Sequence, residues 1–255
     1  MPWYWASHVP LPFWRQAPIT ARPVVRGNLV WGNRGAAIHM NGDLSQGGVG
    51  LITDAVVEKN IAYDNGLGGG SGINGDGVQN SRIVNNLLYG NHASGISLYK
   101  IDAAEGSKHN FIAHNTIVQA THGRWALNIK DASTGNVVYN NILHNHHPFR
   151  GSINILTDSL PGFVSDHNVV MQRFSLDDGG SVIDLTAWRQ ATGQDLSSLV
   201  ATPDVLFVSE AGGDFHLLAS APAVDAGLTL AEVTDDIEGT LARSALRRIL
   251  APTNS

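Results

Sequence analysis

Residues 80–100 read NSRIVNNLLYGNHASGISLYK. In this stretch Asn86 and Asn91 lie five residues apart, and apolar and small residues then alternate from Gly95 to Leu98. Asparagine is a poor residue for the interior of a helix or of a strand. Its regular placement between apolar pairs therefore indicates a structural position that asparagine fills better than other residues.

The Asn86 position recurs along the chain at intervals of 32, 26, 29, 26 and 27 residues. The residues at this position are Asn28, Asn60, Asn86, Asn115, Asn141 and Asn168. In the first three repeats a second asparagine follows five residues later, at Asn33, Asn65 and Asn91. Self-similarity at this period indicates a solenoid, in which each repeat buries its apolar face only against its neighbours.

Each repeat has the pattern of short strands. An apolar residue lies three positions before the asparagine, as Ile83 lies before Asn86, and further apolar residues follow it. A second segment then alternates with period two, as in Gly95-Ile96-Ser97-Leu98. No repeat contains a convincing helical stretch of about ten residues. The sequence therefore predicts an all-β protein, a parallel β-solenoid of about six or more coils.

The asparagines have a structural explanation in such a solenoid. Equivalent residues of successive coils stack at the strand spacing of ~4.8 Å. A buried asparagine at a tight corner can form hydrogen bonds with the asparagines above and below it, and it tolerates the left-handed backbone conformation that tight corners need. We therefore interpret the repeated asparagines as scaffold, because a catalytic role would not require so many copies.

The pattern N-x4-N followed by G-I-x-L resembles the right-handed parallel β-helix repeat proteins of bacteria. That group includes pectate-lyase-like, alginate-lyase-like and polygalacturonase-like enzymes. The resemblance covers residues 24–185, and residues 220–227, SAPAVDAG, are similar to the closing motif S-P-A-I-D-x-G of many such chains. It implies a right-handed parallel β-helix and, less specifically, a secreted carbohydrate-active enzyme.

Four segments are expected: an irregular aromatic N-terminal cap (1–23), the β-helix coils (24–185), a short helix with a closing segment packed on the coils (186–230), and a C-terminal tail (231–255). The aromatic residues of the cap are expected to cover the open end of the stack; they are Trp3, Tyr4, Trp5, Phe13 and Trp14. The chain begins without a signal peptide and lacks the D-I-G-A-Y-E-like ending of similar chains. We interpret it as a truncated form of a longer secreted protein.

Composition limits the expected partners. The net charge of −6 gives no support to nucleic-acid binding, which requires clustered Lys and Arg. The absence of cysteine excludes disulfides and thiolate metal sites, and no apolar run is long enough to span a bilayer. A polysaccharide or oligosaccharide is the expected partner. The chain is expected to be a monomer, or a weak dimer through an open end of the β-helix.

The candidate site lies on outward side chains, because the interior of a β-helix is dry and apolar. When the second strand of each repeat is aligned on its inward Ile and Leu, two outward columns result. The first is His39, Asn74, Ser97, Asn128, Asn154 and Asp184, and the second is Asn41, Asp76, Tyr99, Lys130, Leu156 and Thr186. A neighbouring rim consists of Asp43, Lys100, Asp102, Arg124 and Asp131. Such side chains suit sugar rings, and the alternative is an ordinary solvated sheet face. The candidates for substrate binding are His39, Asn41, Asn74, Asn128, Arg124 and Asn154.

A polysaccharide lyase is the favoured function. Its chemistry, β-elimination, must neutralise a uronate carboxylate and remove the acidified C5 proton. The catalytic candidates are Lys130, Lys100, Asp76 and Tyr99. A hard cation such as Ca²⁺ could bind through the oxygen ligands of Asp76, Asp102 and Asp131. The alternative for the two lysines is a pair of exposed charges neutralised by the rim aspartates.

Two other functions stay open. Residues 71–77, SGINGDG, loosely resemble the N-T-D-G strand of polygalacturonase-like hydrolases, which implies a glycoside hydrolase that uses Asp76 and a rim carboxylate. The other alternative is a non-catalytic β-helix that binds carbohydrate or has a structural role. His144, His146 and His147 lie at a turn without a matching metal-ligand spacing, and we interpret them as surface histidines.

Overall fold

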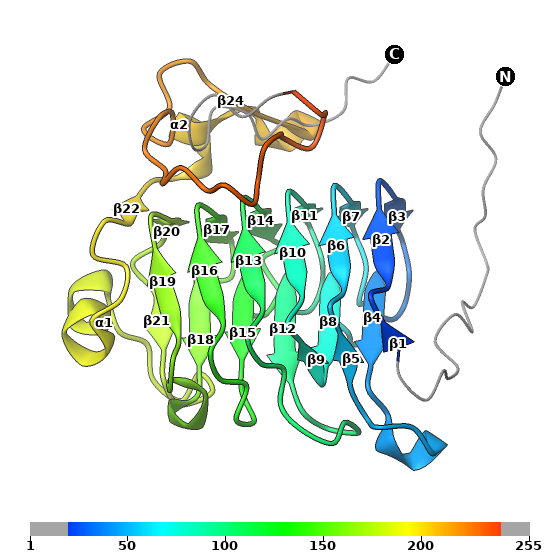
Figure 1. Ribbon diagram of the computed structural model, residues 1–255. Coiled ribbons are helices and arrows are strands. Elements are labelled where there is room, and N and C mark those ends of the chain that lie inside the picture. Colours follow the sequence, from blue (N-terminus) through cyan, green and yellow to red (C-terminus); the bar gives the residue numbers. More distant parts are fainter. Residues whose placement is uncertain (1–19, 241–255) are drawn as a thin grey trace, which may run out of the picture.

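The computed structural model describes residues 20–240, which form a right-handed parallel β-helix of about six coils (Figure 1). Successive coils lie side by side along the molecule, and each coil adds one strand to each wall. The predicted fold class is confirmed. Neither helix within these residues is long and apolar enough to cross a membrane.

Three sheets of parallel strands form the walls, and each is named by its first strand. The β2 sheet contains β2 (Val24–Arg26), β6 (Val56–Glu58), β10 (Arg82–Val84), β13 (Phe111–Ala113), β16 (Val137–Tyr139) and β19 (Val164–Asp166). The β3 sheet contains β3 (Leu29–Trp31), β7 (Ile61–Tyr63), β11 (Leu87–Tyr89), β14 (Thr116–Gln119), β17 (Ile142–Asn145), β20 (Val169–Val170) and β22 (Leu199–Val200). The β4 sheet contains β4 (Ile38–Asn41), β8 (Ile73–Asp76), β12 (Ile96–Tyr99), β15 (Leu127–Ile129), β18 (Ile153–Ile155) and β21 (Phe174–Ser175).

Shorter elements lie at the corners. A small parallel sheet contains β1 (Thr20–Ala21), β5 (Ile52–Thr53) and β9 (Val78–Gln79). Two 3-10 turns, Leu44–Gln46 and Thr157–Ser159, follow strands of the β4 sheet.

Inward side chains of all three sheets fill the core. Ile83 on β10, Leu88 on β11 and Ile96 on β12 are each fully buried in one apolar cluster that extends through the coils. These are the positions that the strand pattern predicts as inward. Each coil buries its apolar row between two neighbouring coils, as a solenoid requires.

The predicted asparagine ladder is present. The Oδ1 atom of Asn86 accepts hydrogen bonds from the backbone N–H and the side-chain amide of Asn60, at 3.0 and 2.9 Å. The Asn86 amide in turn donates to Asn115 Oδ1 at 2.9 Å. The same bonds join all six predicted members, Asn28, Asn60, Asn86, Asn115, Asn141 and Asn168. A shorter ladder joins Asn33, Asn65 and Asn91.

The left-handed backbone conformation lies one residue before the ladder, which differs from the prediction. Positive φ angles of 54–67° occur at Gly27, Lys59, Asn85, His114, Asn140 and His167. This corner residue takes the turn, so the asparagine after it is free to direct its amide along the stack. We call these six residues the corner column.

A further ladder was not predicted. Asn110 donates to Asn136 Oδ1 at 2.9 Å, and both residues are buried. Beside it, Ser133 Oγ accepts from the backbone N–H of Ser107 at 2.9 Å. The signal in the sequence was the interval of 26 residues between the two asparagines, which equals an interval of the first ladder.

Helix α1 (Leu185–Thr192) closes the C-terminal end of the stack. Its Trp188 is fully buried, and the ring stacks on Phe174 with 4.8 Å between the centroids. Two predicted column members, Asp184 and Thr186, belong to this helix: Asp184 caps its N-terminus through a hydrogen bond to Ala187 N–H, and Thr186 lies in its first turn. The prediction that they extend the outward columns is wrong, because the sixth strand of that wall is β21.

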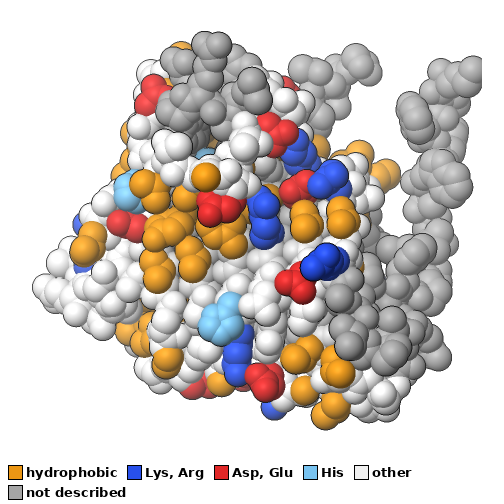
Figure 2. Space-filling model, in the orientation of Figure 1, with side chains coloured by type: hydrophobic (Ala, Val, Ile, Leu, Met, Phe, Trp, Pro, Cys, Tyr) orange, Lys and Arg blue, Asp and Glu red, His pale blue; other side chains and the backbone are white. Residues whose placement is uncertain are grey.

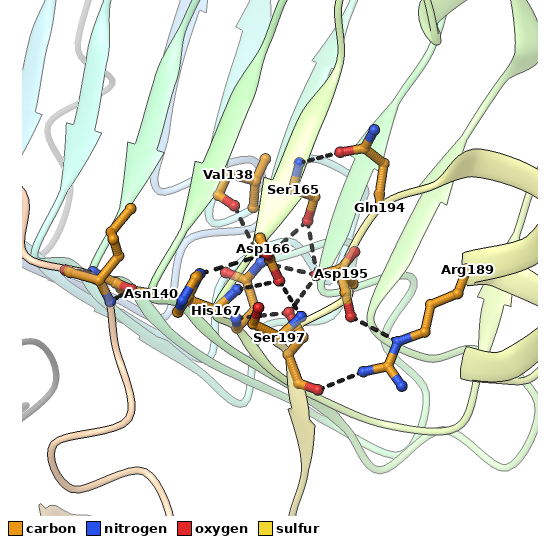
Figure 3. Close-up of polar contacts among 12 residues, drawn as sticks. Val138, Asn140, Ser165, Asp166, His167, Arg189, Gln194, Asp195 and Ser197 are labelled. Carbon is orange, nitrogen blue, oxygen red and sulfur yellow. Dashed lines mark hydrogen bonds and ion pairs between the residues drawn. The ribbon is translucent and has the colours of Figure 1, made fainter.

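A buried carboxylate ends the first ladder. Asp195 Oδ1 accepts from Asn168 Nδ2 at 3.1 Å, Ser165 Oγ at 3.0 Å and Ser198 Oγ at 2.7 Å. Figure 3 shows how Asp195 and Arg189 lie together at this end, where the guanidinium of Arg189 donates to the carbonyl oxygens of Asp195 and Ser198. These polar groups are used within the fold, so we assign them to the scaffold.

The chain then covers the outward face of the β3 sheet. This segment contains α2 (Pro203–Leu206), β23 (Phe207–Ser209) and β24 (Asp214–Leu217), with a short 3-10 turn between the two antiparallel strands. It packs against the later coils, where Leu87 and Phe215 share a buried apolar cluster. The outward face of this sheet is therefore unavailable over those coils.

Residues 227–240, called the strap below, return along the corner between the β2 and β3 sheets (Figure 1). Asn140 of the fifth coil bonds both the N–H and the carbonyl oxygen of Leu228, at 2.9 and 2.7 Å. Lys59 of the second coil forms an ion pair with Asp235 at 2.5 Å. The first ten residues of the expected tail, 231–240, are thus packed on the coils. Residues 1–19, with the aromatic cap, and residues 241–255 lie outside the described residues.

Candidate functional site

The outward face of the β4 sheet assembles the predicted columns. Register pairs His39 with Asn74, Asn74 with Ser97, Ser97 with Asn128, and Asn128 with Asn154. The neighbouring inward residues of the same strands lie in the apolar core, so the alternation that the sequence predicts is present. Five residues of the first predicted column therefore lie in one row across five coils.

Asp76 faces outward but is covered. Only 1% of the residue is exposed, and its carboxylate accepts three backbone N–H groups of the loop that follows β12 on the next coil. Ile101 N–H and Ala103 N–H donate to Oδ1 at 2.9 and 3.4 Å, and Asp102 N–H donates to Oδ2 at 2.8 Å. Such a carboxylate anchors the loop, and neither of its oxygens is free of a donor. The expectation of an exposed Asp76 is wrong, because the loop closes over the strand.

Tyr99, Asn74 and His39 form a contiguous polar group on three successive coils. The Asn74 amide donates to the Tyr99 hydroxyl oxygen at 2.5 Å, and His39 lies beside Asn74 in register. Desolvation, followed by the nearby Asp76 carboxylate, raises the pKa of Tyr99 to about 12. The hydroxyl therefore keeps its proton at neutral pH and can donate it to a ligand.

His39 lies at the N-terminal edge of this group and remains accessible to solvent. Burial of part of its ring lowers its pKa below the ordinary value of 6.5, against the opposing effect of the Asp76 and Asp102 carboxylates. The imidazole is therefore neutral at pH 7. A neutral imidazole can accept a proton, which is the property required of a general base.

The loop that follows β21 covers the C-terminal part of the row, at Asn154. Asn154 is fully buried, and its amide donates to Asn128 Oδ1 at 2.7 Å and to Asp178 Oδ1 at 3.4 Å. The Asn154 Oδ1 atom has no hydrogen-bond partner. Ser175 and Asp178 were not among the predicted site residues, because the strand pattern does not reveal a loop that folds onto its neighbours. Binding at Asn154 would require this loop to move.

The rim residues are less tightly grouped. Lys100 is exposed and Lys130 is half-buried, and neither takes part in an ion pair within the described residues. The alternative, in which Asp102 and Asp131 neutralise these lysines, is not seen as an ion pair: Asp102 accepts from the Asn41 amide at 3.3 Å, and Asp131 accepts from the backbone N–H of Lys100 at 3.3 Å. Arg124 is exposed.

Asp43 lies in another loop. Its carboxylate caps the 3-10 turn that follows by accepting from the N–H of Ser45 at 2.8 Å. Within residues 20–240, no three or more His, Asp or Glu side chains gather so that they could hold a metal ion. The predicted calcium ligands Asp76, Asp102 and Asp131 therefore do not form a site of that kind in this arrangement.

One of the three histidines at the end of β17 and in the turn after it differs from the prediction. His144 is only 6% exposed, and burial lowers its pKa to about 4. His146 is exposed and bonds Glu210, and His147 Nδ1 accepts the N–H groups of the residues that close the turn. His144 is thus a buried histidine, because the segment after β22 covers this part of the sheet.

A second polar surface lies between the strap and the β2 sheet. A pocket of about 390 Å³ is lined by strap residues and by side chains of the first three coils. Its lining contains three basic and three acidic side chains, Arg26, Lys59, Arg82, Glu58, Glu232 and Asp235. Arg26 pairs with Glu58 at 2.5 Å, and Lys59 pairs with Asp235 at 2.5 Å. Figure 2 shows acidic and basic side chains side by side on this face. The pocket therefore has no excess of either charge to attract an ionic ligand.

Comparison of the chain with models of known protein families and with curated proteins gave no match. The functional interpretation of His39, Asn74 and Tyr99 therefore rests on their geometry. The β-helix itself is shared by proteins with many functions and does not select among them.

Proposed function

We propose that the protein is a polysaccharide lyase whose site is the outward face of the β4 sheet at the first three coils. The observation that carries the proposal is the hydrogen bond from Asn74 to Tyr99, with a neutral His39 beside it. Together these side chains supply an amide donor, a protonated hydroxyl and a neutral base. Those are the groups that β-elimination of a uronate polysaccharide requires.

Each group has one role in the step. An amide carries two N–H donors, so Asn74 can bond Tyr99 with one and a uronate carboxylate with the other. His39 removes the C5 proton, the electron pair forms the C4–C5 double bond, and the C4–O bond breaks. The leaving oxygen takes the hydroxyl proton of Tyr99. Water then returns a proton to Tyr99, and His39 releases its proton to solvent.

This assignment changes the roles expected from the sequence. Lys130 and Lys100 were expected to be the base, but among the described residues neither side chain forms a hydrogen bond with Tyr99 or Asn74, so we assign them to the rim that contacts the polymer. Asp76 is the anchor of its loop. A hydrolase built on Asp76 is not favoured, because a general acid or a nucleophile needs a carboxylate oxygen that is free to reach the substrate.

Saccharide binding without cleavage is the second candidate. The amides and hydroxyls of Asn74, Ser97 and Asn128 lie in one row and suit the hydroxyl groups of a sugar chain, whatever the sugar's charge. A neutral polysaccharide would satisfy this row equally well. The two candidates therefore differ in whether His39 and Tyr99 act on a bound uronate.

The experiment is an assay of the full chain against uronate and neutral polysaccharides, which follows the ultraviolet absorbance of unsaturated products together with new reducing ends. Lyase activity gives both signals with a uronate polymer. Tyr99→Phe and His39→Gln should each lower that activity by about 100-fold or more, as the loss of a general acid or base does. His109→Asn, an exposed histidine on another corner, should leave it unchanged.

Three results would contradict the proposal. Reducing ends without absorbance indicate hydrolysis. Retarded migration in a polysaccharide gel without any product indicates the non-catalytic candidate. Full activity in Tyr99→Phe places the chemistry elsewhere on the chain.

A further inference from the structure

Two histidines from successive coils meet at the corner between the β3 and β4 sheets. His92 follows β11, and His122 follows β14, the neighbouring strand of the same sheet. Their ring centroids are 4.4 Å apart, with 29° between the ring planes. His92 Nδ1 and His122 Nε2 are within hydrogen-bonding contact. Neither the proposed function nor the scaffold uses this pair.

The backbone holds the two loops together independently of the rings. The N–H of His92 donates to the carbonyl of Asn65 on the second coil at 2.8 Å. The N–H of Arg124 donates to the carbonyl of Ala93 at 2.8 Å, which joins the third coil to the fourth. The two imidazoles are therefore kept near each other even when their direct contact is broken.

The facing nitrogens limit the states of the pair. One nitrogen must carry a proton and the other a lone pair, because two N–H groups or two lone pairs facing each other repel. Another Lewis acid can replace that shared proton. A neutral imidazole nitrogen is the commonest protein ligand for transition metals, and His122 is exposed, so an ion can reach the pair from solvent.

We propose that His92 and His122 form a two-histidine site for a divalent transition-metal ion such as Zn²⁺, Ni²⁺ or Cu²⁺. Two metal–nitrogen bonds of about 2.05 Å at a tetrahedral angle place the nitrogens about 3.3 Å apart. The two nitrogens must therefore lie farther apart around an ion than in their direct contact, and rotation of the exposed His122 side chain can supply the difference.

The ligand set also indicates which ions bind. No third His, Asp or Glu joins the pair to make a larger cluster among residues 20–240, so water completes the coordination. Two imidazoles favour Cu²⁺ over Zn²⁺ and disfavour Ca²⁺ and Mg²⁺, which require oxygen ligands. The two ligands are 30 residues apart in sequence and meet only in the folded chain. A bound ion therefore links the third and fourth coils and stabilises the folded state.

The test is thermal unfolding of the full chain, first treated with EDTA, with and without added Zn²⁺. We expect a saturable rise in the melting temperature, reversal by EDTA, and one ion per chain in a calorimetric titration. His92→Ala and His122→Ala should each abolish the rise. His109→Asn is the matched control, an exposed histidine on another corner, and it should keep the rise. Asn tolerates the positive φ of 57° at that position.

The effect should also disappear in mildly acidic buffer, because protonated imidazoles do not bind metal ions. The proposal is overturned if Zn²⁺ gives no rise, or if the rise persists in either alanine variant. Neither outcome bears on the lyase assay, because His92 and His122 lie at the corner between the β3 and β4 sheets, whereas His39 and Tyr99 lie on strands of the β4 sheet.

Discussion

The asparagine ladder predicts a large difference between two chemically identical substitutions. Asn86→Ala, in the third coil, should lower the free energy of unfolding strongly. Asn28→Ala, in the first coil, should change it little. Both residues occupy the same position of the repeat, but Asn86 is fully buried with a ladder partner on each side. Asn28 is exposed and donates to Asn60 on one side.

The magnitude follows from the bonds that are lost. Asn86→Ala removes the acceptor of two donors on Asn60, at 3.0 and 2.9 Å. It also removes the donor to the carbonyls of Val57 and Val84 and to Asn115 Oδ1, at 2.9, 3.1 and 2.9 Å. The Asn115 oxygen keeps the backbone N–H of residue 86, so that loss costs little. The remaining losses, at about 1 kcal/mol each, give about 3–5 kcal/mol.

Asn28→Ala costs much less by the same reasoning. The Asn60 oxygen keeps the backbone N–H of residue 28 at 3.1 Å, and the exposed carbonyl of Arg26 can bond water. We expect a cost below about 1 kcal/mol. Urea titrations followed by circular dichroism measure both values, with the wild-type slope as a check that the unfolded state is unchanged. Equal costs, or a cost below about 1 kcal/mol for Asn86→Ala, would refute the ladder as a source of stability.

Three further predictions concern the loop, the end cap and the response to pH. Asp76→Ala should lower the free energy of unfolding by about 2–4 kcal/mol, because three backbone N–H groups lose their acceptor; an unchanged melting temperature would contradict this. Trp188→Ala should cost about 3–5 kcal/mol, because it opens a cavity at the fully buried stack on Phe174, and urea titration measures it. Burial lowers the pKa of His114 and of His144 to about 4 from 6.5. The unfolded chain binds these protons near pH 6.5 and the folded chain only near pH 4, so stability should fall as pH drops through this window and level off below it. Urea titrations across that range should show a smaller fall in His114→Gln, and an unchanged fall would count against this cause.

The repeated features could be predicted from the sequence because each depends on a local rule applied many times. An inward Ile83, a ladder Asn86 and an alternating strand at Ile96 require only the strand period and the interval between coils. The left-handed conformation was predicted at each ladder asparagine, but it occurs at the residue before it. The residue before each asparagine varies among Gly, Lys, Asn and His, so no single residue type marks it.

The features that could not be predicted depend on how distant segments fold onto the coils. Alternation places Asp76 outward correctly, but only the fold of the next loop brings three N–H groups onto its carboxylate. The sequence did contain an indication that another segment covers the outward face of the β3 sheet. Leu87 and Leu88 are adjacent, and both are fully buried, so both faces of that strand must be covered. The candidate site was predicted as a row of residues, while the bond between Asn74 and Tyr99 depends on side-chain conformation across coils.

The strap changes how the β-helix comes apart. In a simple array of repeats, each coil contacts only its neighbours, so the coils can unzip one at a time from a free end. Here the second coil is tied to a residue 176 positions later, through Lys59 and Asp235. Opening that coil must also release a segment that lies over the third and fifth coils. The array therefore unfolds more cooperatively than its repeats would on their own. During synthesis, this tie can form only after the strap has left the ribosome.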